Sequence, residues 1–197
     1  MAYSRHELRL PSTGAVSLAL AACRAASSVT VTDLSDMLPH LRLNVGRNSA
    51  LLQQGRLHVQ ALRWGQEGEA DVQRLAPVQP PYDVIVGSDL IYYSYSPETP
   101  HSRLLLWTLR RLSGPHTTIY LSLSLHHNPE EVDQFLGWAA EWFWVLRLCK
   151  SIPEEWRVHD VLVARLRPRT RPVPRPAPPA AAEAEPEGGA TVREAVP

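Results

Sequence analysis

The chain has 197 residues, a formal net charge of zero and an apolar share of 44%. This length suffices for one domain with a hydrophobic core. A neutral chain gives no electrostatic reason to bind nucleic acid or an anionic membrane, and no apolar run approaches the roughly 20 residues that a membrane span needs. We therefore expect a globular protein without a nucleic-acid or membrane partner.

The two cysteines, Cys23 and Cys149, lie far apart in apolar segments, and the N-terminus lacks the apolar core of a secretory signal. These features predict reduced core cysteines in an intracellular protein rather than a disulfide. The eight histidines show no zinc-binding spacing, so we expect no metal site. Cytoplasmic localisation, with some nuclear presence, follows as an expectation.

The chain before Pro81 alternates between helical and strand periodicity. In chain order the predicted elements are a helix over Gly14–Ala26, a strand over Ser28–Asp33, a helix capped by Ser35 or Asp36 and running through Val45, a strand over Leu57–Leu62 and a helical turn around Val72–Leu75.

The stretch from Tyr82 to Tyr93 begins as a short apolar run rich in β-branched residues, which predicts a strand buried on both faces. It breaks at Gly87 and then presents Ser88 and Asp89. Ligands of open α/β sheets bind just beyond the carboxyl ends of the strands, so this strand end is a candidate site. The alternative interpretation is a strand, a turn and a solvated aspartate.

Alternating elements continue after this strand. They are a helix opened by Pro97 or Pro100 and closed by Ser113–Pro115, a strand over Thr117–Leu125, a helix from Asn128 through Trp142, and an antiparallel pair formed by Trp144–Cys149 and His159–Leu166. Strands alternating with helices predict an α/β architecture with a mainly parallel sheet and an antiparallel C-terminal edge.

From Pro168 onward the composition shifts to Pro, Arg, Ala and Glu with hardly any large apolar residue. Such a segment cannot bury enough surface to offset its ordering entropy, so residues 168–197 are predicted to form a disordered tail. Arg171 and Arg175 leave open a docking role toward an acidic partner or a polyproline reader.

Three predicted strand ends carry groups suited to a nucleoside. Asp33 can accept hydrogen bonds from ribose hydroxyls, Trp64 can stack against a purine, and Ser88 with Asp89 ends the third strand. The turn at 12–14 feeds a helix N-terminus whose backbone N–H groups face a ligand. Together these residues predict a nucleoside-bearing cofactor.

Four segments carry a family resemblance: Thr13–Leu18, Val29–Leu34, Leu62–Gly65 and Ser88–Tyr92. In this order they resemble motifs of the seven-β-strand S-adenosylmethionine-dependent methyltransferases. The L-x-W-G and D-x-x-Y elements in particular resemble the protein-lysine methyltransferases that modify Hsp70-type chaperones, the AAA ATPase valosin-containing protein and translation elongation factors. The resemblance covers about residues 12–166, implies a Rossmann-like sheet, and assigns 12–167 to a methyltransferase-like domain.

The resemblance implies S-adenosyl-L-methionine as the cofactor, a protein substrate and a monomeric chain. The residue roles that it implies are Thr13 and Gly14 in the first cofactor loop, Asp33 on the ribose, Trp64 against the adenine, Ser88 lining the cofactor, and Asp89 with Tyr92 at the mouth where the lysine enters. Because methyl transfer is an in-line displacement, such a site mainly orients a neutral amine. A carboxylate and a phenol can hold that amine and favour loss of its proton, and an aromatic face such as Tyr92 or Tyr93 can stabilise a methylammonium ion.

The chain departs from the family's first motif, which is roughly E-L-G-x-G-T-G. Leu8–Ser12 stands at that place without the acidic residue and without two of three glycines. The segment Arg5–Leu10 alternates polar and apolar residues, whereas a central parallel strand should be apolar. We therefore expect an N-terminally shortened form (a splice variant or an incomplete gene model) in which residues 1–11 are atypical and the first strand is missing or replaced by Arg5–Leu10. Weak cofactor binding and marginal stability follow from that expectation.

Two other functions are weighed against a lysine methyltransferase. A catalytically inactive remnant that binds a protein partner is favoured by the altered first motif. A dinucleotide-dependent oxidoreductase would need a G-x-G-x-x-G turn after the first strand, which the sequence does not contain. Affinity for the cofactor separates the first alternative from an active enzyme.

Overall fold

The computed structural model describes residues 14–23, 26–52, 56–91, 100–126, 129–148, 152–157 and 160–171. The helices in these ranges are α1 (Ala15–Ala22), α2 (Leu38–Arg47), α3 (Glu69–Gln73), α4 (His101–Leu112) and α5 (Pro129–Trp142). The strands are β1 (Val29–Asp33), β2 (Leu57–Ala61), β3 (Tyr82–Ser88), β4 (Ser113–Ser124), β5 (Phe143–Arg147) and β6 (Val161–Pro168).

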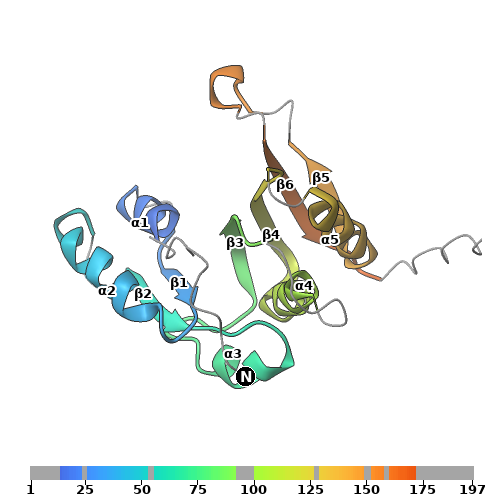
Figure 1. Ribbon diagram of the computed structural model, residues 1–197. Coiled ribbons are helices and arrows are strands. Elements are labelled where there is room, and N and C mark those ends of the chain that lie inside the picture. Colours follow the sequence, from blue (N-terminus) through green and yellow to red (C-terminus); the bar gives the residue numbers. More distant parts are fainter. Residues whose placement is uncertain are drawn as a thin grey trace, which may run out of the picture.

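These strands form two separate sheets in the part of the chain that is described. β1 pairs with β2 in parallel, and the second sheet has the order β3-β4-β6-β5. β3 and β4 are parallel, whereas β6 is antiparallel to both β4 and β5. Figure 1 shows β1, β2, α1 and α2 gathered on one side and the second sheet with α4 and α5 on the other. The expected α/β class with an antiparallel C-terminal edge is confirmed, and the segment expected to replace a first strand, Arg5–Leu10, lies outside the described residues.

The largest core cluster lies between the second sheet and the helices α4 and α5. It is built from one face of the sheet and from the inner sides of both helices, with Phe135, Ile119, Leu121, Leu123 and Leu166 almost fully buried. Each such side chain contributes roughly 1.5–3 kcal/mol on burial. This cluster is larger than the two other core clusters of the described residues, so the second sheet holds most of the described core.

The two sheets are connected through a small apolar cluster rather than through strand pairing. Leu62, which follows β2, packs with Val72, Leu75 and Leu112, and Tyr82 at the start of β3 packs against the same group. Leu112 is the last residue of α4. The end of α4 therefore holds the chain after β2 against the beginning of β3.

The prediction that β3 is buried on both faces is wrong for the described residues. Val84 and Val86 are 56% and 42% exposed, and Tyr120, which pairs with Val86 on β4, is also exposed. The cause is that Ile85 faces α4 and α5, whereas the described helices leave the Val84 face uncovered. β3 also has β4 as its one described neighbour.

Several local predictions need correction. α2 begins at Leu38 with Met37 at its N-cap and no side-chain cap, so neither Ser35 nor Asp36 caps it. Pro39 in its first turn fixes the backbone torsion that starts a helix. Cys23 is exposed rather than buried because α1 ends at Ala22, and Cys149 lies outside the described residues.

The C-terminal strands match expectation more closely. β5 and β6 pair antiparallel, as predicted, and β6 extends to Pro168. Arg169 then donates from its Nε to the carbonyl oxygens of Ala140 and Phe143 at 3.0 and 3.1 Å. The described fold thus runs through Arg169, while most of the predicted tail, residues 172–197, lies outside the described residues.

The described residues contain neither a membrane-spanning helix nor a cluster of metal ligands. None of the described helices combines the length and the apolar character needed to cross a bilayer. The described His, Cys, Asp and Glu side chains also form no group of three or more that could hold a metal ion.

Candidate functional site

Asp33 lies at the end of β1, beside the end of β2. The parallel register pairs Asp33 with Ala61, and the Leu62 N–H donates to the Asp33 carbonyl oxygen at 2.9 Å. One carboxylate oxygen of Asp33 accepts the Leu34 N–H at 2.8 Å. Its other oxygen has no hydrogen bond within the described ranges, so it is available to a hydroxyl group of a ligand.

Gly14 precedes α1 and lies close to β1. Its φ of +67° places it in the left-handed region, where glycine is favoured. A Cβ at this position would lie 3.1 Å from a Leu41 methyl and 3.8 Å from a Val31 methyl. A glycine therefore brings the start of α1 to within contact of β1, two residues before Asp33. Thr13, its predicted partner in the cofactor loop, lies outside the described residues.

The turn after β2 carries Trp64 and is anchored on α4. Trp64 is half-buried and packs against the large core cluster. The Gly65 N–H donates to the Thr108 hydroxyl at 2.9 Å. Gly65 has a φ of +83°, and a Cβ there would lie 2.8 Å from a Leu104 methyl. Both the backbone torsion and the contact with α4 thus require glycine directly after Trp64.

The other end of the same turn is held by Asp71 in α3. Its carboxylate accepts the Arg63 N–H at 3.2 Å and the Arg63 Nε at 3.0 Å, and a terminal nitrogen of Arg74 lies 3.5 Å away. The Arg63 side-chain hydrogen bond lowers the pKa of Asp71, against the burial that would raise it. Trp64 therefore lies between two residues, Arg63 and Gly65, whose backbone N–H groups are both fixed by side chains.

Replacing Asp71 with asparagine should destabilise the chain by about 1–3 kcal/mol at neutral pH, because the charge-assisted bonds to Arg63 are lost. Because the folded pKa of Asp71 is depressed, its contribution is complete above the unfolded value of about 3.9 and is lost as pH falls through the folded pKa. Urea unfolding of both proteins at pH 7 and pH 3 measures this. An equal stability difference at the two pH values would contradict the assignment.

The strand end of β3 presents Ser88 and Asp89 to solvent. Asp89 has a φ of +53°, an uncommon value outside glycine, and its N–H donates to the Ser122 carbonyl at 2.8 Å. Such torsions cost about 1–3 kcal/mol and persist where the surroundings hold them. The next residues supply that support, because Leu90 and Ile91 pack into the large core cluster. Tyr92, the predicted partner of Asp89, lies outside the described residues.

The predicted site residues thus fall into two groups. Gly14, Asp33 and Trp64 belong to the first sheet and its turns, and Ser88 and Asp89 to the second. Gly14 lies against β1, and Asp33 lies beside the end of β2, which Trp64 follows by three residues. α4 contacts Gly65 directly after Trp64 and shares a core cluster with Ile91, which follows Asp89 by two residues. Sequence patterns did not single out Thr108 or Asp71, since a buried threonine and a short-helix aspartate carry no motif.

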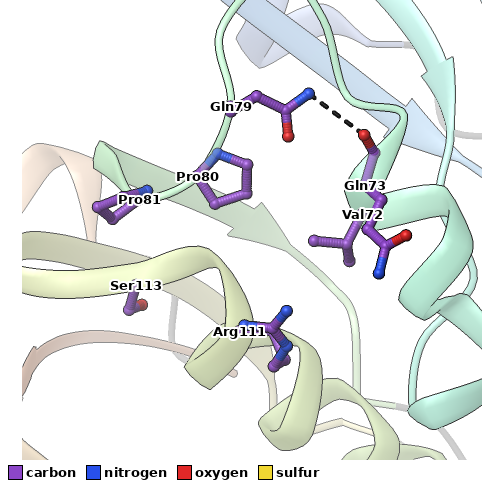
Figure 2. Close-up of a pocket in the computed structure, with 7 residues that line it drawn as sticks. All are labelled: Val72, Gln73, Gln79, Pro80, Pro81, Arg111 and Ser113. Carbon is purple, nitrogen blue, oxygen red and sulfur yellow. Dashed lines mark hydrogen bonds between the residues drawn. The ribbon is translucent and has the colours of Figure 1, made fainter.

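A cavity of about 290 Å³ lies elsewhere, between α3, the end of α4 and the start of β3. Figure 2 shows its lining residues, with the Gln79 amide donating to the Gln73 carbonyl oxygen at 3.3 Å. Arg111 on its wall is paired with Glu69. None of the predicted site residues lines this cavity, so it is separate from the candidate site.

Comparison with protein-family models matches residues 8–141 to the family described as lysine methyltransferase. The chain belongs to this lysine methyltransferase family. The match includes every residue of the candidate site and starts at Leu8, the first residue of the segment that departs from the glycine-rich motif. The recognition made from the L-x-W-G and D-x-x-Y motifs is confirmed.

Two similar curated proteins are both named EEF1A lysine methyltransferase 3. The mouse protein is 40% identical over 94 residues, which is 48% of this chain and 34% of that protein. The Xenopus tropicalis protein is 28% identical over 133 residues, which is 68% of this chain and 53% of that protein. The chain therefore spans about a third to a half of the length of these relatives.

Solved structures support the fold. A protein of Pyrococcus horikoshii OT3 aligns with a TM-score of 0.51 at 11% identity, covering 80% of this chain and 78% of that chain. The apo form of the S-adenosylmethionine-dependent methyltransferase SibL aligns with the same score at 17% identity, covering 80% and 48%. At such identities the likeness shows the α/β fold alone.

Proposed function

We propose that this chain is an S-adenosylmethionine-dependent methyltransferase that acts on a lysine of a protein. Its family membership supports this reaction class, and two similar proteins are named for lysine methylation of EEF1A. A monomeric chain with a substrate of the elongation-factor, chaperone or AAA ATPase type is part of the same proposal.

The position of Asp33 is the main support for the proposed cofactor. It ends a parallel strand, and one of its carboxylate oxygens has no hydrogen bond among the described residues. A ribose diol needs such an acceptor at a strand end. Gly14 supplies a second fitting feature, because a Cβ would press into Leu41 where α1 begins. These residues fit a nucleoside-bearing cofactor.

S-adenosyl-L-methionine would supply an electrophilic methyl group, whose bond to sulfur breaks as the bond to the lysine nitrogen forms. Asp33 would hydrogen-bond the ribose hydroxyls, and Trp64 would pack against the face of the adenine. Gly14, which has no side chain, would let the backbone come close to the cofactor. Asp89 is exposed at its strand end, so its carboxylate can accept a hydrogen bond from the incoming amine and take up the proton that the nitrogen must lose. Tyr92 is proposed as the second contact of that amine.

Calorimetric titration with S-adenosylhomocysteine tests this proposal. The wild-type chain is expected to bind, and Asp33→Ala is expected to reduce the affinity about 10- to 100-fold, because hydrogen bonds to a charged group contribute about 1.5–3 kcal/mol. Asp36→Ala is the matched control, since this exposed aspartate lies three residues away in the turn after β1. Equal losses in both variants would contradict the role of Asp33.

The alternative of an inactive, partner-binding module rests on a specific observation, the missing glycines at Leu8–Ser12. Backbone approaches a bound nucleotide most closely at such glycines. A folded wild-type chain that does not bind S-adenosylhomocysteine would favour this alternative over the enzyme.

A further inference from the structure

Thr108 on α4 makes a hydrogen bond across 43 positions of sequence, to the backbone of Gly65. Its side chain is 2% exposed. The hydroxyl accepts the Gly65 N–H at 2.9 Å and donates to the Leu104 carbonyl oxygen at 3.1 Å. Both hydrogen-bonding functions of the hydroxyl are thus used, one within α4 and one toward the turn that carries Trp64.

This hydrogen bond matters because the strands do not connect the two halves of the site. β1 and β2 share no pairing with β3 in the described structure. Strand pairing among the described residues therefore does not fix the positions of Asp33 and Trp64 relative to the strand end at Ser88 and Asp89. The position of one group relative to the other has to be set by an element that contacts both.

α4 is such an element. One of its faces meets the turn after β2, through the Thr108 hydroxyl and the Leu104 side chain. Leu105, one residue along, belongs to the same core cluster as Ile91, which follows Asp89 by two residues. Figure 1 shows α4 beside β4 in the second sheet, with α3 below it.

We propose that Thr108 is a positioning residue that sets the Trp64 turn relative to the strand end at Asp89. This inference rests on the proposed function, since its consequence is cofactor affinity. Thr108 contacts neither substrate nor cofactor; it acts through Gly65. Losing its hydroxyl leaves the buried Gly65 N–H without a partner and frees the turn from α4.

Thr117 provides a closely matched control. It is also 2% exposed, accepts a glycine N–H (Gly114, 2.8 Å) and donates to a carbonyl oxygen (Tyr82, 2.6 Å). It lies where β3 begins, at the end opposite Ser88. Thr108→Val and Thr117→Val therefore remove the same chemistry at comparable burial, one beside the candidate site and one far from it.

The experiment measures S-adenosylhomocysteine affinity and the melting temperature of the 197-residue wild-type chain and of both variants. Both substitutions should lower the melting temperature by similar amounts. Thr108→Val should weaken binding at least about tenfold and Thr117→Val less than about twofold. Thr108→Ser, which keeps the hydroxyl, should retain affinity within about threefold of wild type. The amide of Gly65 should exchange with solvent faster in Thr108→Val alone.

The outcomes separate the positioning role of Thr108 from the proposed function of the chain. Equal affinity of wild type and Thr108→Val, or an equal loss in Thr117→Val, overturns the positioning role while leaving the proposed function standing. If Thr108→Val does not fold, Thr108→Ala is compared with Thr108→Ser, and equal affinities of those two overturn the role as well. A wild-type chain that does not bind overturns the proposed function itself, and this inference with it.

Discussion

Replacing Gly68 with alanine is expected to destabilise the chain by more than about 4 kcal/mol, a loss that comparable small domains seldom survive. A Cβ at Gly68 would lie 1.9 Å from the Arg63 carbonyl oxygen and 2.7 Å from its carbonyl carbon. The atoms that the Cβ would meet belong to the backbone, so no side-chain rotation relieves the clash. Because the φ of Gly68 is −86°, ordinary for any residue, the cost is steric rather than torsional.

Gly137 and Gly46 are the controls for this substitution. Both lie in helices, and a Cβ at either would meet no atom within 4 Å. Alanine there should stabilise the chain by about 0.5–1 kcal/mol, since glycine is a poor helix residue. Urea unfolding of the three variants measures the contrast. A Gly68→Ala chain as stable as Gly137→Ala would show that the turn after β2 is not packed as described.

The pattern of strands and helices was predictable because hydrophobic periodicity reports which face of each element is buried. β1, β2 and β3 begin and end within two residues of their predicted limits, and the antiparallel pairing of β5 with β6 was also predicted. The end of α4 at Leu112 was predicted as well, whereas the start of the next strand was less accurate. The strand was expected from Thr117, but β4 starts at Ser113 directly after Leu112, because Ser113 pairs with Tyr82.

The motif residues of the candidate site could be predicted from the sequence, whereas the residues that hold them in position could not. Asp33 and Trp64 stand at strand ends that periodicity locates, so sequence alone places them. Thr108 and Asp71 act through contacts with residues 43 and eight positions away. Nothing local distinguishes such residues from a threonine on an amphipathic helix or an aspartate near a helix start. Burial and partner atoms, which only a three-dimensional structure gives, reveal them.

The division into two sheets bears on the expectation that Arg5–Leu10 replaces a first strand. β1 has β2 as its one described neighbour, and β3 has β4. α1 is apolar except for Ser17, yet Val16 is exposed, and so are Val84 and Val86 on β3. Apolar helices of this kind are normally buried on all sides. We expect a strand from the segment before α1 to pair along the edges of β1 and β3 that have no described partner, since it would connect to β1 by a right-handed crossover.

Deleting residues 1–11 is therefore expected to lower stability by about 3 kcal/mol, or roughly 6–12 °C in melting temperature for a chain of this size. The reason is that a strand from this segment would form backbone hydrogen bonds with the edges of β1 and β3 that have no described partner. Deleting 11 residues from the other terminus, 187–197, is the control and should change the melting temperature by less than about 2 °C, because that segment has almost no large apolar residue. Equal effects of the two deletions would contradict the expectation.

A point variant sharpens this test without changing chain length. Proline at Leu8 removes a backbone donor in the middle of the segment, which a paired strand does not tolerate but an unpaired tail does. Leu8→Pro should then lower the melting temperature by at least half as much as the deletion, and Ala2→Pro should leave it unchanged. Hydrogen exchange locates the effect, since the amides of β1 and β3 should lose protection while those of β5 and β6 keep theirs. Unchanged protection in β1 and β3 would mean that the segment before α1 does not join the two sheets, and that the contacts of α4 with the turn after β2, including the cluster around Leu112, hold them together.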